Sequence, residues 1–132
     1  MTTASPAPRG DPLVLIVDDD ERNLRLARDV LRADGLRTIE AASAAEAIEL
    51  AGRHLPDVVL MDLGLPDTDG ASAARALGAQ AQTARIPVVA LTALPQAGEW
   101  FHEAGFAGYL EKPFDIREFA ERVRGFCAPA DV

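Results

Sequence analysis

Carboxylate, hydroxyl and ammonium groups each stand at the end of a short apolar segment of this chain. They are Asp18 and Asp19 after residues 13–17, Asp62 after 58–61, Thr92 after 86–91 and Lys112 after 107–111. Neighbouring carboxylates repel one another unless positive charge joins them. A hard divalent cation such as Mg²⁺ accepts carboxylate oxygens and relieves that repulsion. Such a group of side chains suits phosphoryl transfer, because positioning and charge neutralisation provide most of the catalysis and an Asp can accept the phosphoryl group.

The apolar segments themselves predict the strands of a parallel sheet. Segments 13–17, 58–61 and 86–91 are short, rich in Val, Ile and Leu, and not interrupted by alternating polar residues. That pattern is typical of strands that are covered on both faces. Two weaker segments, 36–41 and 107–111, fit the remaining strand positions.

Stretches with helical spacing lie between these segments. An apolar stripe runs through residues 20–33, a capping box begins at Ser43, and Asp115 starts the last helix. Gly35 and Gly105 stand where the first and fourth helices should end. On the last helix, one apolar face is expected from Ile116, Phe119, Val123 and Phe126. Strand and helix thus alternate five times, which predicts a doubly wound α/β domain with helices on both faces of a parallel sheet.

Length and composition indicate one domain. The 132 residues are enough for one hydrophobic core, and the net charge of −8 disfavours direct contact with nucleic acid or anionic lipid. A single cysteine, Cys127, cannot form an intramolecular disulfide and fits a reducing cytoplasm. No apolar run approaches the ~20 residues of a membrane span. We expect a disordered leader over residues 1–11, the domain over 12–127 and a flexible tail over 128–132.

The polar residues at the strand ends are expected to meet at one place. Ligands of open α/β sheets bind beyond the carboxyl ends of the strands, where the strand order reverses. With the strand order 2-1-3-4-5, the second strand is an edge strand away from that point. The other four strands therefore bring their terminal polar side chains to one crevice.

Four segments of the chain resemble the receiver domain of bacterial two-component response regulators. They read LVLIVDDDERN, VVLMDLGLPDTDG, VVALTA and GYLEKPF, and they follow one another in the order of that family. The resemblance covers about residues 12–127. It implies a flavodoxin-like (βα)5 fold with the strand order 2-1-3-4-5.

The resemblance also implies a role for each matching residue. Asp62 would be the phosphoacceptor, and Thr92 and Lys112 would contact phosphoryl oxygens. Mg²⁺ would be held by Asp19, by Asp62, by the backbone carbonyl of Gly64 and, through a water, by Asp18. Thr92 and Tyr109 would form the switch, and the bond between Lys112 and Pro113 would be cis.

The implied function is a phosphorylation-dependent signalling switch. A histidine kinase or a histidine phosphotransfer protein would donate the phosphoryl group, and the chain would catalyse only its own phosphorylation and dephosphorylation. The downstream protein would bind the face formed by the fourth helix, fifth strand and fifth helix. Neither nucleic acid nor membrane is an expected direct partner.

Two positions depart from the common receiver pattern. The segment 92–105 is shorter by about two residues than we expect for a receiver, and Pro95 and Gly98 disfavour a long helix there. We therefore expect a short fourth helix that begins near Gly98. Gly64 has no side chain to shield an acyl phosphate from water, which predicts a short phosphoryl lifetime.

Three other functions fit the sequence less well. A Mg²⁺-dependent phosphohydrolase of the haloacid dehalogenase type would need a second Asp two residues after its nucleophile, where this chain has Gly64. A flavodoxin-like cofactor carrier would need a Ser-, Thr- or Gly-rich loop after the first strand, where this chain has Asp18, Asp19 and Asp20. A degenerate receiver that acts as a scaffold would not need the full set of site residues.

Overall fold

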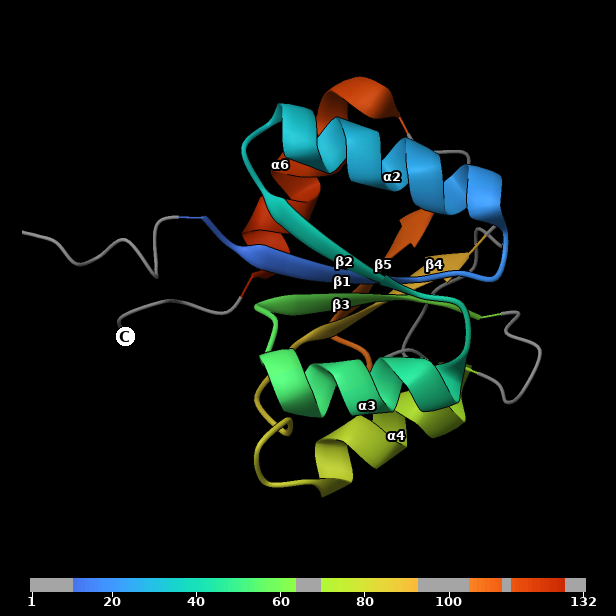
Figure 1. The fold of residues 1–132 in the computed structure, drawn as a ribbon, viewed down its shortest axis with the longest axis vertical. Helices are drawn as coiled ribbons and strands as arrows, with labels where there is room; N and C mark the ends of the chain where they lie inside the picture. Colours follow the sequence, from blue (N-terminus) through green and yellow to red (C-terminus); the bar gives the residue numbers. More distant parts are fainter. Residues whose placement is uncertain (1–10, 64–69, 93–104, 113–114, 128–132) are drawn as a thin grey trace, which may run out of the picture.

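The chain folds around one five-stranded parallel sheet with the order β2-β1-β3-β4-β5 (Figure 1). A computed structural model describes residues 11–63, 70–92, 105–112 and 115–127. The strands are β1 (Leu13–Val17), β2 (Arg37–Ala41), β3 (Val58–Asp62), β4 (Val88–Thr92) and β5 (Gly108–Glu111). All neighbouring strands pair in parallel. The predicted sheet and its strand order are confirmed.

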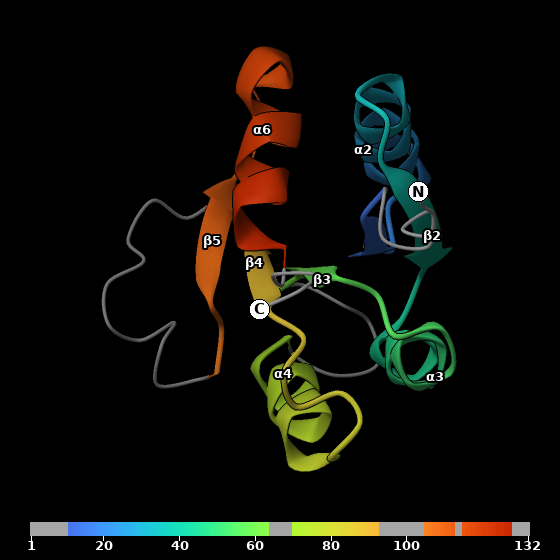
Figure 2. The ribbon, with the colours of Figure 1, turned by 90° about the vertical axis from the view of Figure 1, so that its left-hand side faces the viewer.

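Helices cover both faces of this sheet. In the described part of the chain they are α2 (Glu21–Ala33), α3 (Ala44–His54), α4 (Gly70–Ala79) and α6 (Ile116–Phe126). Figures 1 and 2 agree in placing α2 and α6 on one face and α3 and α4 on the other. Side chains alternate along a strand, so one core forms on each face. Leu15 and Val17 of β1 face α3 and α4, while Val14 and Ile16 face α2 and α6.

Helix-capping residues begin the helices where the sequence predicts. The Asp20 side chain caps α2 by accepting a hydrogen bond from the backbone N–H of Arg22 at 2.9 Å. Ser43 and Glu46 form the predicted capping box, in which the Ser43 hydroxyl accepts from the Glu46 N–H. Asp115 caps α6. Each cap satisfies a backbone N–H that has no partner within its helix.

Two details of the predicted elements are corrected. The fourth strand begins at Val88 and not at residue 86, because the N–H of Ile86 bonds the Thr83 carbonyl in a turn and Pro87 has no N–H to donate. Ile116 is 57% exposed although Phe119 and Val123 on the same helix are buried. Ile116 is the first residue of α6 and lies one turn before the helix reaches the core.

Several predictions fall outside the described residues. They are residues 1–10 of the leader predicted over 1–11, the short fourth helix near Gly98, the conformation at Gly64, the bond between Lys112 and Pro113, and the tail over 128–132. Gly35 and Gly105 adopt positive φ angles, of 90° and 102°, and for Gly35, which follows the C-cap of α2, this is the conformation expected where a helix ends. None of the described helices has the length and apolarity needed to cross a membrane.

Candidate functional site

Strand register brings the predicted site residues to one edge of the sheet. Val17 of β1 is paired with Met61 of β3, so Asp18, which follows β1, and Asp62, the last residue of β3, lie at the same level. The backbone N–H of Lys112 donates to the Thr92 carbonyl at 2.8 Å, which continues the pairing of β4 with β5. The parallel sheet therefore places the polar ends of β1, β3, β4 and β5 side by side.

Three carboxylates converge at this edge. Asp18, Asp19 and Asp62 each offer an oxygen, and these oxygens lie within 4.8 Å of one another. Asp18 is 1% exposed, and one of its oxygens accepts a hydrogen bond from the Asp20 N–H at 2.9 Å. Asp62 is partly buried and Asp19 is exposed. The cluster thus has a fixed, buried side and a side that is open to solvent.

Lys112 supplies the positive charge that faces these carboxylates. Its ammonium lies 3.0 Å from an oxygen of Asp18 and 3.1 Å from an oxygen of Asp62. Burial alone would lower the pKa of Lys112, but the hydrogen bonds and charges of Asp18 and Asp62 outweigh burial, and the pKa is raised. Lys112 therefore stays protonated and holds the carboxylates of two strands together.

The donor set of this edge fits a hard divalent cation. Its three carboxylates face one ammonium, which leaves two negative charges, the number that one divalent cation neutralises. Carboxylate oxygens are the ligands that Mg²⁺ prefers. Gly64, the predicted source of a backbone ligand, lies outside the described residues.

Thr92 and Tyr109 lie next to this cluster on adjacent strands. Tyr109 of β5 is paired with Ala90 of β4, and both contribute to the core on the α3 and α4 side. Because residues two apart on a strand share a face, Thr92 faces the same side as Ala90. Thr92 is 4% exposed, whereas Tyr109 is half-buried. The two predicted switch residues are therefore diagonal neighbours on one face of the sheet.

The sequence predicts that the positive charge of Lys112, at the end of β5, reaches the strand-end carboxylates, and the structure places its ammonium there. The specific ion pair with Asp18 is a finding of the structure, because β5 and β1 are separated by two strands. Asp20, the residue after the two site carboxylates, caps α2 instead.

Comparison with known proteins identifies the family. The family model of the response regulator receiver domain matches residues 14–124. This chain belongs to the response regulator receiver domains. Receiver domains are signalling proteins and not classical enzymes, and they bind Mg²⁺ at an acidic pocket.

A curated relative has almost the same length as this receiver. The polar-differentiation response regulator DivK from Brucella ovis is 36% identical over 119 residues, which cover 89% of this chain and 97% of DivK. The match therefore extends over nearly all of both chains.

Solved structures share the fold of this receiver. A response regulator from Chloroflexus aurantiacus is 33% identical, with a TM-score of 0.81 over 88% of this chain and 97% of its own. The receiver domain of the sensor histidine kinase PA1611 from Pseudomonas aeruginosa is 34% identical, with a TM-score of 0.80 over 89% and 98% of the two chains. That structure is described with a magnesium ion coordinated in its active-site cleft.

Proposed function

We propose that Asp62 of this receiver accepts a phosphoryl group from a phosphohistidine of a histidine kinase or histidine phosphotransfer protein. The observation that carries the proposal is the position of Asp62 at the end of β3. There one carboxylate oxygen lies 3.1 Å from the Lys112 ammonium. A carboxylate oxygen of Asp62 also lies within 4.8 Å of oxygens of Asp18 and Asp19, which is close enough for one metal ion to bind all three residues. The buried Asp18 carboxylate and the partly buried Lys112 ammonium thus flank a carboxylate that is itself partly accessible to solvent.

Asp19 and Asp62 are the residues we expect to bind Mg²⁺ directly, with the carbonyl of Gly64 as a third ligand and Asp18 acting through a water. When bound, the cation would neutralise charge on the carboxylates and on the incoming phosphoryl oxygens. Asp18 fits the indirect role because both of its carboxylate oxygens already accept hydrogen bonds. One accepts from the Lys112 ammonium and the other from the Asp20 N–H.

The transfer itself needs one new bond and one broken bond. A carboxylate oxygen of Asp62 attacks the phosphorus atom in line with the imidazole nitrogen. The P–N bond breaks, and its electron pair stays on the imidazole. Lys112 contacts a developing phosphoryl oxygen with the ammonium that now faces Asp62, and the Thr92 hydroxyl contacts another. The product is an acyl phosphate, whose phosphoryl group carries about two negative charges in place of the single charge of the carboxylate.

Signalling follows from contacts that only the phosphoryl group provides. Thr92 moves toward the new oxygens, and Tyr109, its diagonal neighbour on β5, fills the space that Thr92 leaves. The added contacts shift the population between two conformations of the domain. The downstream partner is a protein that binds the face of β5 and its flanking helices. Residues 12–127 carry this switch, which we place in the cytoplasm, with no direct role for nucleic acid or membrane.

A small phosphodonor tests this function. The full chain is incubated with acetyl phosphate, with and without Mg²⁺, and its intact mass is measured, with Asp62→Asn as the control variant. We expect the wild type to gain one phosphoryl group only when Mg²⁺ is present, and Asp62→Asn to gain none. A wild type that stays unmodified while its fold is intact would contradict the proposal.

A further inference from the structure

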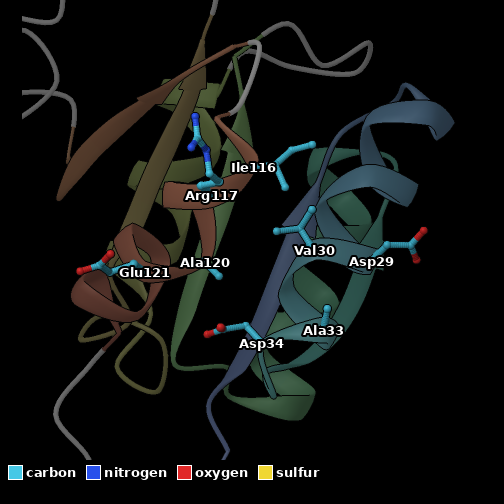
Figure 3. Close-up of a pocket in the computed structure, with 8 residues that line it drawn as sticks. All are labelled: Asp29, Val30, Ala33, Asp34, Ile116, Arg117, Ala120 and Glu121. Carbon is cyan, nitrogen blue, oxygen red and sulfur yellow. The ribbon is translucent and has the colours of Figure 1, made fainter.

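Helix α2 carries different charges on its two sides. An open groove of about 490 Å³, the α2–α6 groove, lies between one side of α2 and helix α6, and the charged residues of α2 that line it, Asp29 and Asp34, are acidic (Figure 3). The other side of α2 lies against β2 and carries Arg28 and Arg32. These two arginines therefore lie over the edge strand β2, on the side of α2 away from the groove.

Strand β2 is one edge of the sheet, and only one side of its backbone is paired. The N–H of Arg37 and the carbonyl of Ala41 both bond β1 or the residues at its ends. Because successive residues of a strand direct their backbone groups to opposite sides, Thr38 and Glu40 direct theirs to the free edge. Such unpaired N–H and carbonyl groups are a template for pairing with another strand.

Two arginines beside this free edge, Arg32 and Arg37, have no carboxylate partner among the described residues. Arg32 donates through Nε to the hydroxyl of Thr38 at 2.8 Å, and Arg37 donates through Nε to the backbone carbonyl of Asp11 at 3.0 Å. Both acceptors are neutral, and both arginines are exposed. The Nε bond fixes each guanidinium, while its two terminal nitrogens stay available as donors for a carboxylate.

The carboxylates near β2 do not neutralise these two arginines. Glu40 pairs with Arg28 at 3.1 Å. Glu46, beyond the C-terminal end of β2, accepts the backbone N–H of Ala42 at 3.0 Å. Asp11 offers its backbone carbonyl to Arg37, and its carboxylate makes no ion pair with a described residue. The first half of β2 therefore carries two guanidinium groups without an ionic partner, in a chain whose net charge is −8.

We propose that the free edge of β2 binds an extended acidic segment of a partner protein as a sixth strand, with carboxylates beside Arg32 and Arg37. Main-chain hydrogen bonds to Thr38 and Glu40 would hold the segment, and the arginines would select its side chains. Strand β2 lies at the edge of the sheet opposite to β5 (Figure 2). The surface is therefore separate from phosphoryl acceptance at Asp62 and does not depend on it.

The register of β2 predicts the side chains that this segment carries. Paired residues of neighbouring strands place their side chains on the same face of the sheet. A residue beside Thr38 therefore faces Arg32 on the α2 side, and a residue beside Arg37 faces the opposite side, so two adjacent acidic residues meet both arginines. The residue beside Ile39 meets a half-buried apolar side chain, which favours Val or Ile.

Three synthetic peptides probe this edge. The first, Glu-Glu-Val-Thr-Val-Glu-Glu, reads the same in both directions and so offers an acidic pair to the arginines in either strand orientation. The second has lysines in place of the glutamates, and the third has prolines in place of the first valine and the threonine, which removes N–H donors that strand pairing needs. Each is titrated into the full ¹⁵N-labelled chain. We expect the first peptide to bind at least about tenfold more tightly than the others, because both strand pairing and charge complementarity are needed.

Amide hydrogen exchange locates the bound peptide. The Thr38 and Glu40 N–H groups face the free edge, and we expect the first peptide at saturation to slow their exchange at least about tenfold. The N–H of Arg37, which already bonds the Pro12 carbonyl, should change less. Protection of residues 108–111 on the other edge strand instead, or no protection of Thr38 and Glu40, would overturn the proposal.

A matched pair of double variants separates binding at β2 from general electrostatic attraction. Arg32→Gln with Arg37→Gln removes both charges but keeps an amide donor at each position, and should weaken the first peptide roughly tenfold. The control, Arg75→Gln with Arg85→Gln, makes the same change in net charge at exposed positions on α4 and before β4. It should leave the affinity within about twofold. Equal weakening by the two double variants would contradict a site at β2.

Two further measurements separate this edge from the phosphoryl site and from self-association. Asp62→Asn should bind the first peptide as the wild type does, and a loss of binding in this variant would mean that the peptide needs the strand-end site. Sedimentation of the free chain should show a monomer. A dimer that Arg32→Gln with Arg37→Gln abolishes would overturn the proposal, because a second copy of the chain would then occupy the edge.

Discussion

Asp18 at the end of β1 is 1% exposed and has a charged partner at 3.0 Å, whereas Ile116 at the entrance of the α2–α6 groove is 57% exposed. The strand-end site is built from residues that the sheet register forces together. The α2–α6 groove, where Ile116 lies, is lined by exposed side chains and also by Ala120, which is buried in the core. The first region is specified by backbone pairing, while the second is specified by the packing of two helices on the core.

The largest effect expected from this contrast is on stability. Phe119→Ala removes a buried aromatic side chain that is 3% exposed and should lower the free energy of unfolding by about 3–5 kcal/mol. Ile116→Ala, three residues earlier on the same helix, should change it by less than about 0.5 kcal/mol. Urea denaturation of both variants measures the difference. Similar losses for the two would mean that Ile116 is covered in solution and that the groove is closed.

The same contrast explains how much of each region can be predicted from the sequence. Asp62 could be assigned because an unbroken apolar segment ends there and the parallel strands direct their carboxyl ends to one edge. The presence of Lys112 at the same edge could be predicted in the same way, but its pairing with Asp18 in particular could not, because these residues follow strands that are separated by two others. Helical periodicity placed Ile116 on the apolar face of its helix. It carries no information on where that helix extends past the core.

A second test concerns the only ammonium of the described strand-end site. Lys112→Met keeps most of the side-chain volume but removes the charge beside Asp18 and Asp62. The rate of phosphorylation by acetyl phosphate should fall by about 10²–10³, the usual cost of losing one transition-state charge contact. The affinity for Mg²⁺ should rise, because the carboxylates lose a competing cation. A parallel fall in rate and in Mg²⁺ affinity would assign Lys112 a purely structural role.

A smaller effect is expected from the buried carboxylate. Asp18→Asn should weaken Mg²⁺ binding by about 10- to 100-fold, as is usual for residues that hold a metal through an intermediate group. Asp20→Asn is the matched control, because Asp20 caps α2 and lies outside the three-carboxylate cluster. Calorimetric titration with MgCl₂ compares the two. Equal losses would show that the site responds to net charge and not to the arrangement of its ligands.

The smallest effect is expected where α2 and α6 are tied together. Arg124 and Asp34 pair at 2.8 Å with about half of each side chain exposed. Arg124→Ala should therefore cost less than about 1 kcal/mol of unfolding free energy, as is usual for solvated ion pairs. Thermal melts at low and at high salt measure this cost and its screening. A loss as large as that of Phe119→Ala would show that this pair, and not the buried apolar side chains, holds α6 in place.

Reduction of the phosphorylated chain with borohydride tests most directly whether Asp62 is the acceptor. Borohydride converts an aspartyl phosphate to homoserine, and peptide mass spectrometry locates the converted residue. After treatment with acetyl phosphate and Mg²⁺, we expect homoserine at position 62 and at no other Asp. Homoserine at position 18 or 19, or its formation without Mg²⁺, would contradict the arrangement in which β1 and β5 supply the charges and β3 supplies the acceptor.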